Sequence, residues 1–385
     1  MKKILYVTTI GRTINAFFIP HIKFLINKGY IVDIATNVDI DIDKEILDNG
    51  CKIFDIPFSR NPLNPINKLA FDRIRKLQQI QQYDIIHVHT PVASFITRLA
   101  LRNIKKVKIV YTCHGFHFYK GGSLLNWAIF YPIEKIAARW TDYLITINND
   151  DFNIAKNFNL RKDGKVSKVY GVGIEKEKYC IKNFDRCKYR QKFSIQEDDF
   201  VILVLAEINK NKNHKQLVKS MHILKEKYPN IKAIFAGTGP SEERLKKQIR
   251  RYELENQIIL VGWRDDVKEL INMSDLIGLF SRREGLGKCL LEGMVCEKNI
   301  IATDTRGPRE LINDNENGFL VKFNDYIETA KLIEKIYCDK QLRAKFKKNS
   351  ARKVECYLLE NVLNQLDSIY DHLYKEELEL IGDYK

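Results

Sequence analysis

Two glutamates that flank a glycine-containing loop are the residues in this sequence best suited to chemistry. Glu284 and Glu292 stand in the segment SRREGLGKCLLEG, with Gly285 and Gly287 between them. Glycines let backbone amides approach a ligand closely, and a helix after the loop would turn its free N–H groups and positive dipole end toward an anion. One carboxylate could then reach a sugar hydroxyl and the other a ribose, with phosphate between them. The spacing equally allows two helix-capping or surface acids.

Lys212 supplies a cation for the same kind of site. It lies in LAEINKNKNHKQLV, residues 205–218, directly after an apolar run that predicts a strand. A lysine beyond the carboxyl end of a parallel strand can face a diphosphate. The alternative is a solvated lysine on a lysine-rich surface.

Histidines follow two further apolar runs. His114 opens HGFHFYKGG after KIVYTC, where a histidine can donate to a phosphate or a sugar hydroxyl. His117 is either a second contact or a packed side chain. His87 and His89 would share one face of a strand, but no acidic partner follows them. This favours histidines of the core or of a cleft wall over a metal pair.

The cysteines indicate neither a metal site nor a disulfide framework. None of the eight belongs to a CxxC pair, and several lie inside apolar runs, where a free cysteine behaves as a small hydrophobe. We therefore expect a reducing compartment, with no structural disulfide and no bound metal.

Strand-like and helix-like segments alternate along the first half of the chain. Residues 67–82 and 92–103 have helical length and spacing. Short runs rich in Ile and Val, typical of strands buried in a parallel sheet, are KKILYVTT, YIVDIAT, CKIFDIP, DIIHVHT, KIVYTCH and DYLITIN. The alternation predicts an α/β fold with a doubly wound sheet.

A second alternating pattern begins after YGVGIEKEKY, residues 170–179. Its apolar runs are FVILVLAE, IKAIFAGTG, QIILVG, DLIGLF and KNIIATD, followed by a helical tail. A chain of 385 residues exceeds what one core usually serves, so we expect two Rossmann-like domains with a cleft between them. Domain boundaries are predicted at 1–174, with a helix over 358–385 crossing back onto it, and 175–357. Ligands of such sheets bind beyond the strands' carboxyl ends, where the candidate residues lie.

The ordered motifs resemble those of family 4 of the retaining glycosyltransferases, which have the GT-B fold. They are TTIGRT, DIIHVHTP, YTCHGFHFYKG, YGVG, NKNKNH, FAGTGP, VGWRDDV and the two-glutamate block ending in ATDTRGPRELI. The resemblance spans essentially the whole chain and is closest to bacterial enzymes of capsule, exopolysaccharide or lipid-linked glycan synthesis. It implies a cytoplasmic hexosyltransferase that moves a sugar from a nucleotide sugar, with UDP expected, to a glycan or polyprenyl-diphosphate-linked acceptor.

The resemblance also assigns roles to the candidate residues. It implies that Glu284 contacts the donor sugar, Lys212 the diphosphate, and that His114 has a positioning and electrostatic role near the anomeric carbon. Glu292 would hold the donor ribose. Gly11 would let backbone amides approach the diphosphate, although a plain turn explains it as well. Further donor contacts are expected from Arg12, Lys210, Gly262, Trp263, Arg264, Gly285, Leu286 and Gly287.

The sequence departs from the family pattern at Glu207, where an arginine is common. A carboxylate cannot bind a diphosphate, so this contact is missing or is supplied by Lys210 or Arg12. We expect Glu207 to turn away from the phosphate and to engage a backbone amide or a neighbouring cation. The resemblance implies no metal or other cofactor. It also implies a front-face displacement in which the leaving diphosphate assists deprotonation of the acceptor.

Charge and aromatic residues suggest where the acceptor side lies. The net charge is 64 − 49 = +15, of which residues 1–175 contribute 25 − 15 = +10. This suits a phosphorylated ligand or an anionic membrane, although lysines also serve solubility alone. Residues 116–140 combine aromatic and basic side chains, as in a rim touching the inner face of the plasma membrane, or else form a buried helix. The basic residues do not align with aromatics on one sheet face, so no nucleic acid partner is expected.

Two other functions fit the same pattern. A nucleotide-sugar 2-epimerase or hydrolase of this fold would need further carboxylates near the sugar, and the sequence offers none beyond Glu284. A non-catalytic partner subunit of another transferase would be consistent with Glu207. Donor turnover without an acceptor would distinguish the first function, and donor binding without turnover the second.

Overall fold

The computed structural model describes residues 2–382, with side chains as far as Tyr374. Its contacts divide these residues into two compact units. Unit 1 comprises the described residues up to Val172 and those from Val362 onward, and unit 2 runs from Gly173 to Asn361. Residues 383–385 of the predicted C-terminal helix lie outside the described part of the chain.

The described part of unit 1 contains a seven-stranded sheet in which all neighbouring strands are parallel. The strand order is β3-β2-β1-β4-β5-β6-β7, so the chain starts in the middle of the sheet and winds outward in both directions. The central strands are buried on both faces, because helices cover both. The strands are β1 (Lys3–Ile10), β2 (Ile31–Asn37), β3 (Ile53–Asp55), β4 (Ile85–Val88), β5 (Lys108–Cys113), β6 (Tyr143–Thr146) and β7 (Lys165–Lys168).

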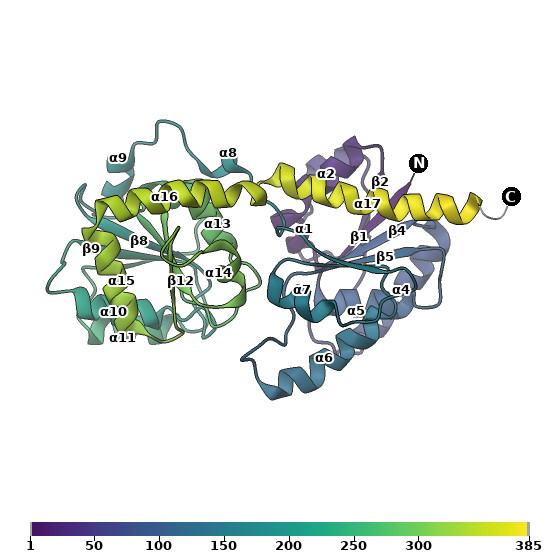
Figure 1. Cartoon of the computed structure of the whole chain (residues 1–385), viewed down its shortest axis with the longest axis horizontal. Helices are drawn as coiled ribbons and strands as arrows, with labels where there is room; N and C mark the ends of the chain where they lie inside the picture. Colours follow the sequence, from purple (N-terminus) through teal and green to yellow (C-terminus); the bar gives the residue numbers. More distant parts are fainter. Residues whose placement is uncertain (1, 383–385) are drawn as a thin grey trace. The chain divides into compact units, whose positions relative to one another are not determined.

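The helices of unit 1 lie on the two faces of this sheet (Figure 1). They are α1 (Gly11–Phe17), α2 (Ile19–Asn27), α3 (Lys44–Asp48), α4 (Ile66–Gln81), α5 (Pro91–Ala100), α6 (Leu124–Ala138) and α7 (Asn149–Ala155). Helix α17 (Leu359–Gly382) begins in unit 2 and continues along unit 1. Its Tyr370 hydroxyl lies 3.0 Å from the Tyr6 hydroxyl and 2.5 Å from His87 Nδ1, so the last helix closes the core of the first sheet.

The described part of unit 2 contains a six-stranded parallel sheet in the order β10-β9-β8-β11-β12-β13. The strands are β8 (Phe200–Leu205), β9 (Ile231–Ala236), β10 (Ile258–Gly262), β11 (Leu276–Leu279), β12 (Asn299–Thr303) and β13 (Phe319–Val321). The accompanying helices are α8 (Lys176–Tyr179), α9 (Arg186–Gln191), α10 (Lys215–Leu224), α11 (Glu242–Arg251), α12 (Val267–Met273), α13 (Lys288–Val295), α14 (Arg306–Leu311), α15 (Tyr326–Cys338), α16 (Lys340–Val354) and the 3₁₀ turn η1 (Glu355–Tyr357). Both units are doubly wound, and the predicted fold class is confirmed.

Three elements differ from the expectation. Strands β7 and β13 were not predicted, because KVSK is charged and FLV is only three residues long. The chain after β1 does not turn at Gly11 but begins helix α1 there. A Cβ on Gly11 would lie 2.9 Å from Ile42 Cδ1, so the missing side chain makes room for the neighbouring loop.

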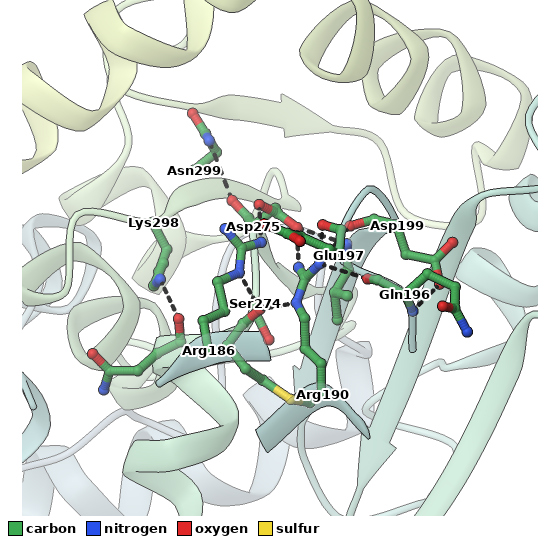
Figure 2. Close-up of polar contacts among 12 residues, drawn as sticks. Arg186, Arg190, Gln196, Glu197, Asp199, Ser274, Asp275, Lys298 and Asn299 are labelled. Carbon is green, nitrogen blue, oxygen red and sulfur yellow. Dashed lines mark hydrogen bonds and ion pairs between the residues drawn. The ribbon is translucent and has the colours of Figure 1, made fainter. Parts of the chain in front are cut away.

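A buried charge network holds the start of unit 2 against its sheet (Figure 2). The guanidinium groups of Arg186 and Arg190 converge on Asp275, at 2.5 and 2.8 Å. Asp275 also accepts from the backbone N–H of Val201, and Arg190 donates to three carbonyl oxygens of residues 196–199. Burial, with the neighbouring Arg186 charge, lowers the pKa of Lys298 to about 8. Asp275 directly precedes β11, so this network lies at the strands' amino ends and serves the fold.

Candidate functional site

A cavity of about 520 Å³ opens at the carboxyl ends of β8, β9, β10 and β11. This volume is within the usual range for small-ligand sites. Its lining brings together Leu205, Ala206, Glu207, Lys212, Ala236, Gly237, Thr238, Trp263, Arg264, Val267, Leu279, Glu284, Gly287, Lys288, Cys289 and Glu292. Six predicted site residues are among them, drawn from three separate loops and helix α13.

Lys212 and Glu284 form an ion pair in this cavity. Lys212 Nζ lies 2.6 Å from Glu284 Oε1, and the two side chains are 25% and 14% exposed. Burial lowers the pKa of the Lys212 ammonium, but the Glu284 carboxylate outweighs this and the net shift is upward. Lys212 is therefore a permanent cation. An anionic ligand in the cavity could bind it in place of Glu284 or together with Glu284.

The loops that carry this pair are tied to each other. Asn211 Nδ2 donates to the Arg283 carbonyl at 3.1 Å, and the Arg282 N–H donates to the Asn211 carbonyl at 2.7 Å. Asn209 Oδ1 accepts from the Lys212 backbone N–H at 2.9 Å. The cation and the carboxylate are consequently positioned by backbone contacts rather than by their own ion pair alone.

The glycine loop leads into the amino end of α13, which faces the cavity through Gly287, Lys288 and Cys289. Gly287 has φ 99°, a left-handed conformation that favours glycine. Gly285 and Leu286 do not line the cavity. They pack instead against Gly307, where a Cβ would lie 2.7 Å from the Leu286 nitrogen. The positive end of a helix dipole attracts anions, and the start of α13 faces the cavity.

Glu292 lies one turn into α13 and is only 8% exposed. Its Oε1 accepts a hydrogen bond of 2.9 Å from the Tyr179 hydroxyl, and Lys288 Nζ lies 3.7 Å from the same oxygen. Burial, and then the Glu292 charge, raises the pKa of Tyr179, so the hydroxyl keeps its proton. Tyr179 was not predicted from the sequence, because a tyrosine 113 positions away carries no local signal of this contact.

The loop after β10 supplies the other wall. Trp263 is 74% exposed, and Arg264 is held by Asp266, with Nε 2.7 Å from Oδ1. Gly262 does not line the cavity, but its carbonyl accepts from the Gly237 N–H at 2.7 Å. Gly237 and Thr238, in the FAGTGP motif, do line it and were not predicted as site residues. A Cβ on Gly237 would lie 2.1 Å from the Ala206 carbonyl oxygen, so this glycine permits the close approach of β9 to β8.

Glu207 lines the cavity, and its charge helps to raise the pKa of Lys212, so a neighbouring cation, one of its two expected partners, interacts with it. Its carboxylate also accepts a hydrogen bond of 2.9 Å from Asn209 Nδ2, a side-chain amide that was not predicted as its partner. Lys210, proposed as a substitute for the missing arginine, is exposed and does not line the cavity. Arg12 lies in unit 1, 69% exposed and 3.8 Å from Asp39. At this end of the cavity Lys212 thus lies near two carboxylates, Glu207 and Glu284.

The predicted histidines belong to unit 1. Within the side chains described, His114 Nε2 is buried and has no hydrogen-bond partner, and neither ring nitrogen of His89 has one. Burial, with a smaller effect of His21, lowers the pKa of His114 to about 4, so the ring is neutral. His87 is a core histidine, bonded to Tyr370 and Thr112, as one of the alternatives predicted. His117 stacks on Phe130 with ring centroids 4.8 Å apart.

Helix α6 within residues 116–140 has apolar side chains on its outer face. Leu124 and Leu125 are 86% and 67% exposed, and Ile129, Ile133 and Ile136 continue the same stripe. The opposite face packs on the core of unit 1 through Trp127, Phe130 and Tyr131. The alternative of a wholly buried helix is therefore wrong. Exposed basic residues flank the stripe at Lys120, Lys135 and Arg139.

No group of three or more His, Cys, Asp or Glu side chains in the described part of the chain could hold a metal ion. Among the same residues, no helix is both long and apolar enough to cross a membrane.

The sequence matches known family models over both units. Residues 3–148 match the model described as Glycosyl transferase 4-like, and residues 185–353 match Glycosyl transferases group 1. EpsD of Bacillus subtilis (strain 168), a protein assigned to the glycosyltransferases, is 36% identical over 383 residues, which cover 98% of this chain and 99% of EpsD. The chain belongs to the group 1, or GT4, family of glycosyltransferases and is an enzyme of that class, as the motifs predicted.

Two more distant relatives extend the comparison. The UDP-Gal:alpha-D-GlcNAc-diphosphoundecaprenol alpha-1,3-galactosyltransferase of Escherichia coli is 24% identical over 339 residues, covering 86% of this chain and 84% of that enzyme. The crystal structure of Anabaena Alr3699/HepE in complex with UDP and glucose matches with a TM-score of 0.78 and 20% identity, over 97% of this chain and 100% of that one. This likeness shows that the predicted GT-B fold is correct.

Proposed function

We propose that this enzyme transfers a sugar, with retention of anomeric configuration, from a UDP-sugar to a glycan or polyprenyl-diphosphate-linked acceptor in the synthesis of a bacterial surface polysaccharide. The observation that carries the proposal is the cavity of unit 2. It combines a permanent cation, Lys212, the amino end of α13 and two separated carboxylates, Glu284 and Glu292. These groups match the diphosphate, the sugar and the ribose of a nucleotide sugar.

In the proposed reaction the bond from the sugar C1 to the diphosphate oxygen breaks. The acceptor hydroxyl oxygen forms its bond to C1 on the same face, and its proton passes to the leaving diphosphate. Lys212 and the amides at the start of α13 stabilise the negative charge that develops on that diphosphate. Preorganised donors of this kind each contribute about 2–4 kcal/mol of transition-state stabilisation. We assign to His114, as a neutral hydrogen-bonding ring, a positioning and electrostatic role toward the reacting sugar.

The relatives support the choice of donor and acceptor. The Escherichia coli enzyme is named for UDP-Gal and for a diphosphoundecaprenol-linked sugar, and the Anabaena structure holds UDP and glucose. The site itself supports a nucleobase bound between the exposed side chain of Trp263 and the loop that begins at Gly237 after β9.

The donor is tested by calorimetric titration with UDP, GDP and ADP, followed by thermal-shift screening of the sugars of the preferred nucleotide. We expect UDP to bind most tightly. Replacement of Glu292 by Ala should weaken UDP binding by about 1–3 kcal/mol, because a charged hydrogen-bond acceptor is lost. Unchanged UDP affinity in E292A would remove Glu292 from the ribose site, and preference for GDP or ADP would refute the choice of base.

We further propose that the enzyme acts at the inner face of the plasma membrane and contacts it through the outer face of α6. An apolar stripe flanked by Lys120, Lys135 and Arg139 complements an anionic lipid surface in both polarity and charge. A lipid-linked acceptor would be met at the same surface.

The membrane contact is tested by co-sedimentation with vesicles of phosphatidylglycerol and phosphatidylcholine. The double variant L125E/I129E should lose vesicle binding, whereas I80E, which alters a 63% exposed isoleucine of α4 in the same unit, should retain it. Equal binding by both variants would refute the assignment to α6. Self-association that L125E/I129E abolishes, without any vesicle binding, would show that a second copy covers this face instead.

A further inference from the structure

The buried side of Glu292 is formed by α8, a four-residue helix that ends at Tyr179. Two contacts fix the end of α8 in place. Asn272 Nδ2, from α12, donates to the Tyr179 carbonyl at 2.7 Å, and Cys180 Sγ donates to the Val295 carbonyl at 3.0 Å. The end of α8, at Tyr179 and Cys180, is thus anchored to α12 and α13.

The Tyr179 hydroxyl donates a hydrogen bond to the carboxylate of Glu292. The hydrogen bond to Oε1 is 2.9 Å long, and both residues are 8% exposed. Glu292 lines the cavity, but Tyr179 does not. The tyrosine therefore acts from behind the carboxylate, where it has no access to a ligand in the cavity.

A glutamate side chain one turn into a helix has several rotamers, and fixing one of them costs entropy when a ligand binds. A buried hydroxyl that occupies Oε1 removes this freedom in advance and leaves Oε2 to accept from the ligand. A neutral donor also stabilises the charged carboxylate in a site that contains a second and a third carboxylate, Glu284 and Glu207.

We infer that Tyr179 is a positioning residue for donor recognition, which orients Glu292 so that Oε2 receives the ribose hydroxyls. This inference rests on the proposed function, in which Glu292 binds the ribose. It adds a residue of α8 to the donor site and predicts that α8 controls discrimination between ribose and deoxyribose donors. Tyr179 takes no part in the chemical step.

The test is the variant Y179F, which removes one oxygen atom. We expect the Kd for UDP and the KM for the donor to rise about 5- to 20-fold, while kcat changes less than about twofold. This is less than the effect of losing a direct hydrogen bond to a charged group, because Tyr179 acts on the ligand only through Glu292. The Kd for 2′-deoxy-UDP should rise much less, so the preference for UDP over 2′-deoxy-UDP should fall. A purely structural defect would weaken both ligands equally.

Y228F is the matched control, because Tyr228 also donates to a carboxylate, Glu334 Oε1 at 2.7 Å, but lies outside the cavity. It should leave UDP binding unchanged. In the double variant Y179F/E292A, the tyrosine substitution should have no further effect on UDP affinity, because both changes act through one contact. Melting temperatures of all variants confirm that each is folded.

Two results overturn the inference separately from the proposed function. If E292A weakens UDP binding but Y179F does not, or if the two effects are additive, Tyr179 does not position Glu292. If E292A itself leaves UDP binding unchanged, the proposed ribose contact is wrong, whatever Y179F does.

Discussion

Replacement of Lys212 by Met tests the central electrostatic feature of the site. The substitution removes the ammonium that lies 2.6 Å from Glu284 Oε1 but keeps most of the aliphatic stem. A charge-assisted hydrogen bond to a ligand contributes about 1.5–3 kcal/mol, so the Kd for UDP should rise about 10- to 100-fold. Because the charge on the diphosphate increases as the sugar leaves, kcat should fall further, by about 10²- to 10³-fold.

Stability must be separated from catalysis in this variant. Without Lys212, the Glu284 carboxylate, 14% exposed, loses its ion-pair partner, which costs about 1–3 kcal/mol. The double variant K212M/E284Q removes that unpaired charge and should recover most of the lost free energy of unfolding. It should not recover activity. Urea denaturation measures the first quantity, and initial rates with a radiolabelled UDP-sugar measure the second.

Lys210 provides the matched control on the same loop. It is exposed and does not line the cavity, so K210M should leave UDP affinity and kcat within about twofold of the wild type. If K210M rather than K212M abolishes UDP binding, the diphosphate cation has been assigned to the wrong lysine. If K212M retains both affinity and turnover, the electrostatic account of the cavity is refuted.

Three further outcomes are expected. E207Q should tighten UDP binding about three- to tenfold, measured by calorimetry, because a carboxylate that lines the cavity repels the diphosphate; weaker binding would show that Glu207 contacts the ligand favourably. Activity should persist in EDTA, because the resemblance to family 4 implies a metal-independent enzyme, and a complete loss of turnover that Mg²⁺ restores would contradict this. The free energy of unfolding should fall as the pH drops from 6.5 toward 4. Burial lowers the pKa of His21 and His114 to about 4, so the unfolded chain binds more protons than the folded chain in this window. Each histidine that is protonated only in the unfolded chain lowers the free energy of unfolding by about 1.4 kcal/mol per pH unit. Urea denaturation in 0.5-unit pH steps measures the free energy of unfolding. A free energy of unfolding that does not change between pH 6.5 and 5 would show that the rings of His21 and His114 are not held neutral.

Much of the fold was predictable because its strands are buried on both faces. Runs such as FVILVL have to lie in the interior, and their alternation with helical segments leaves few topologies other than a doubly wound sheet. The strands KVSK and FLV were missed for the opposite reason. They occupy the edges of their sheets, where a polar or very short strand is tolerated and leaves little pattern.

The site was predictable where its residues follow strands and was not where it depends on distant partners. Lys212, Glu284 and Glu292 stand in loops or helix starts after parallel strands, and such positions converge at one edge of a sheet. The hydrogen bond between Glu207 and the Asn209 side-chain amide was not predicted, because the direction of a side chain depends on its neighbours in the folded loop.

The sequence by itself determined the family, the two doubly wound sheets and the loops that carry the candidate chemistry, because these follow from hydrophobic pattern and local motifs. Only the tertiary structure decided that Lys212 pairs with Glu284, that Tyr179 stands behind Glu292 and that the apolar outer face of α6 is exposed. Apolar residues lie around most of the circumference of α6, so its sequence does not indicate which side the core covers. Contacts between residues 72 and 113 positions apart likewise depend on how the sheet brings its loops together, which no local pattern encodes.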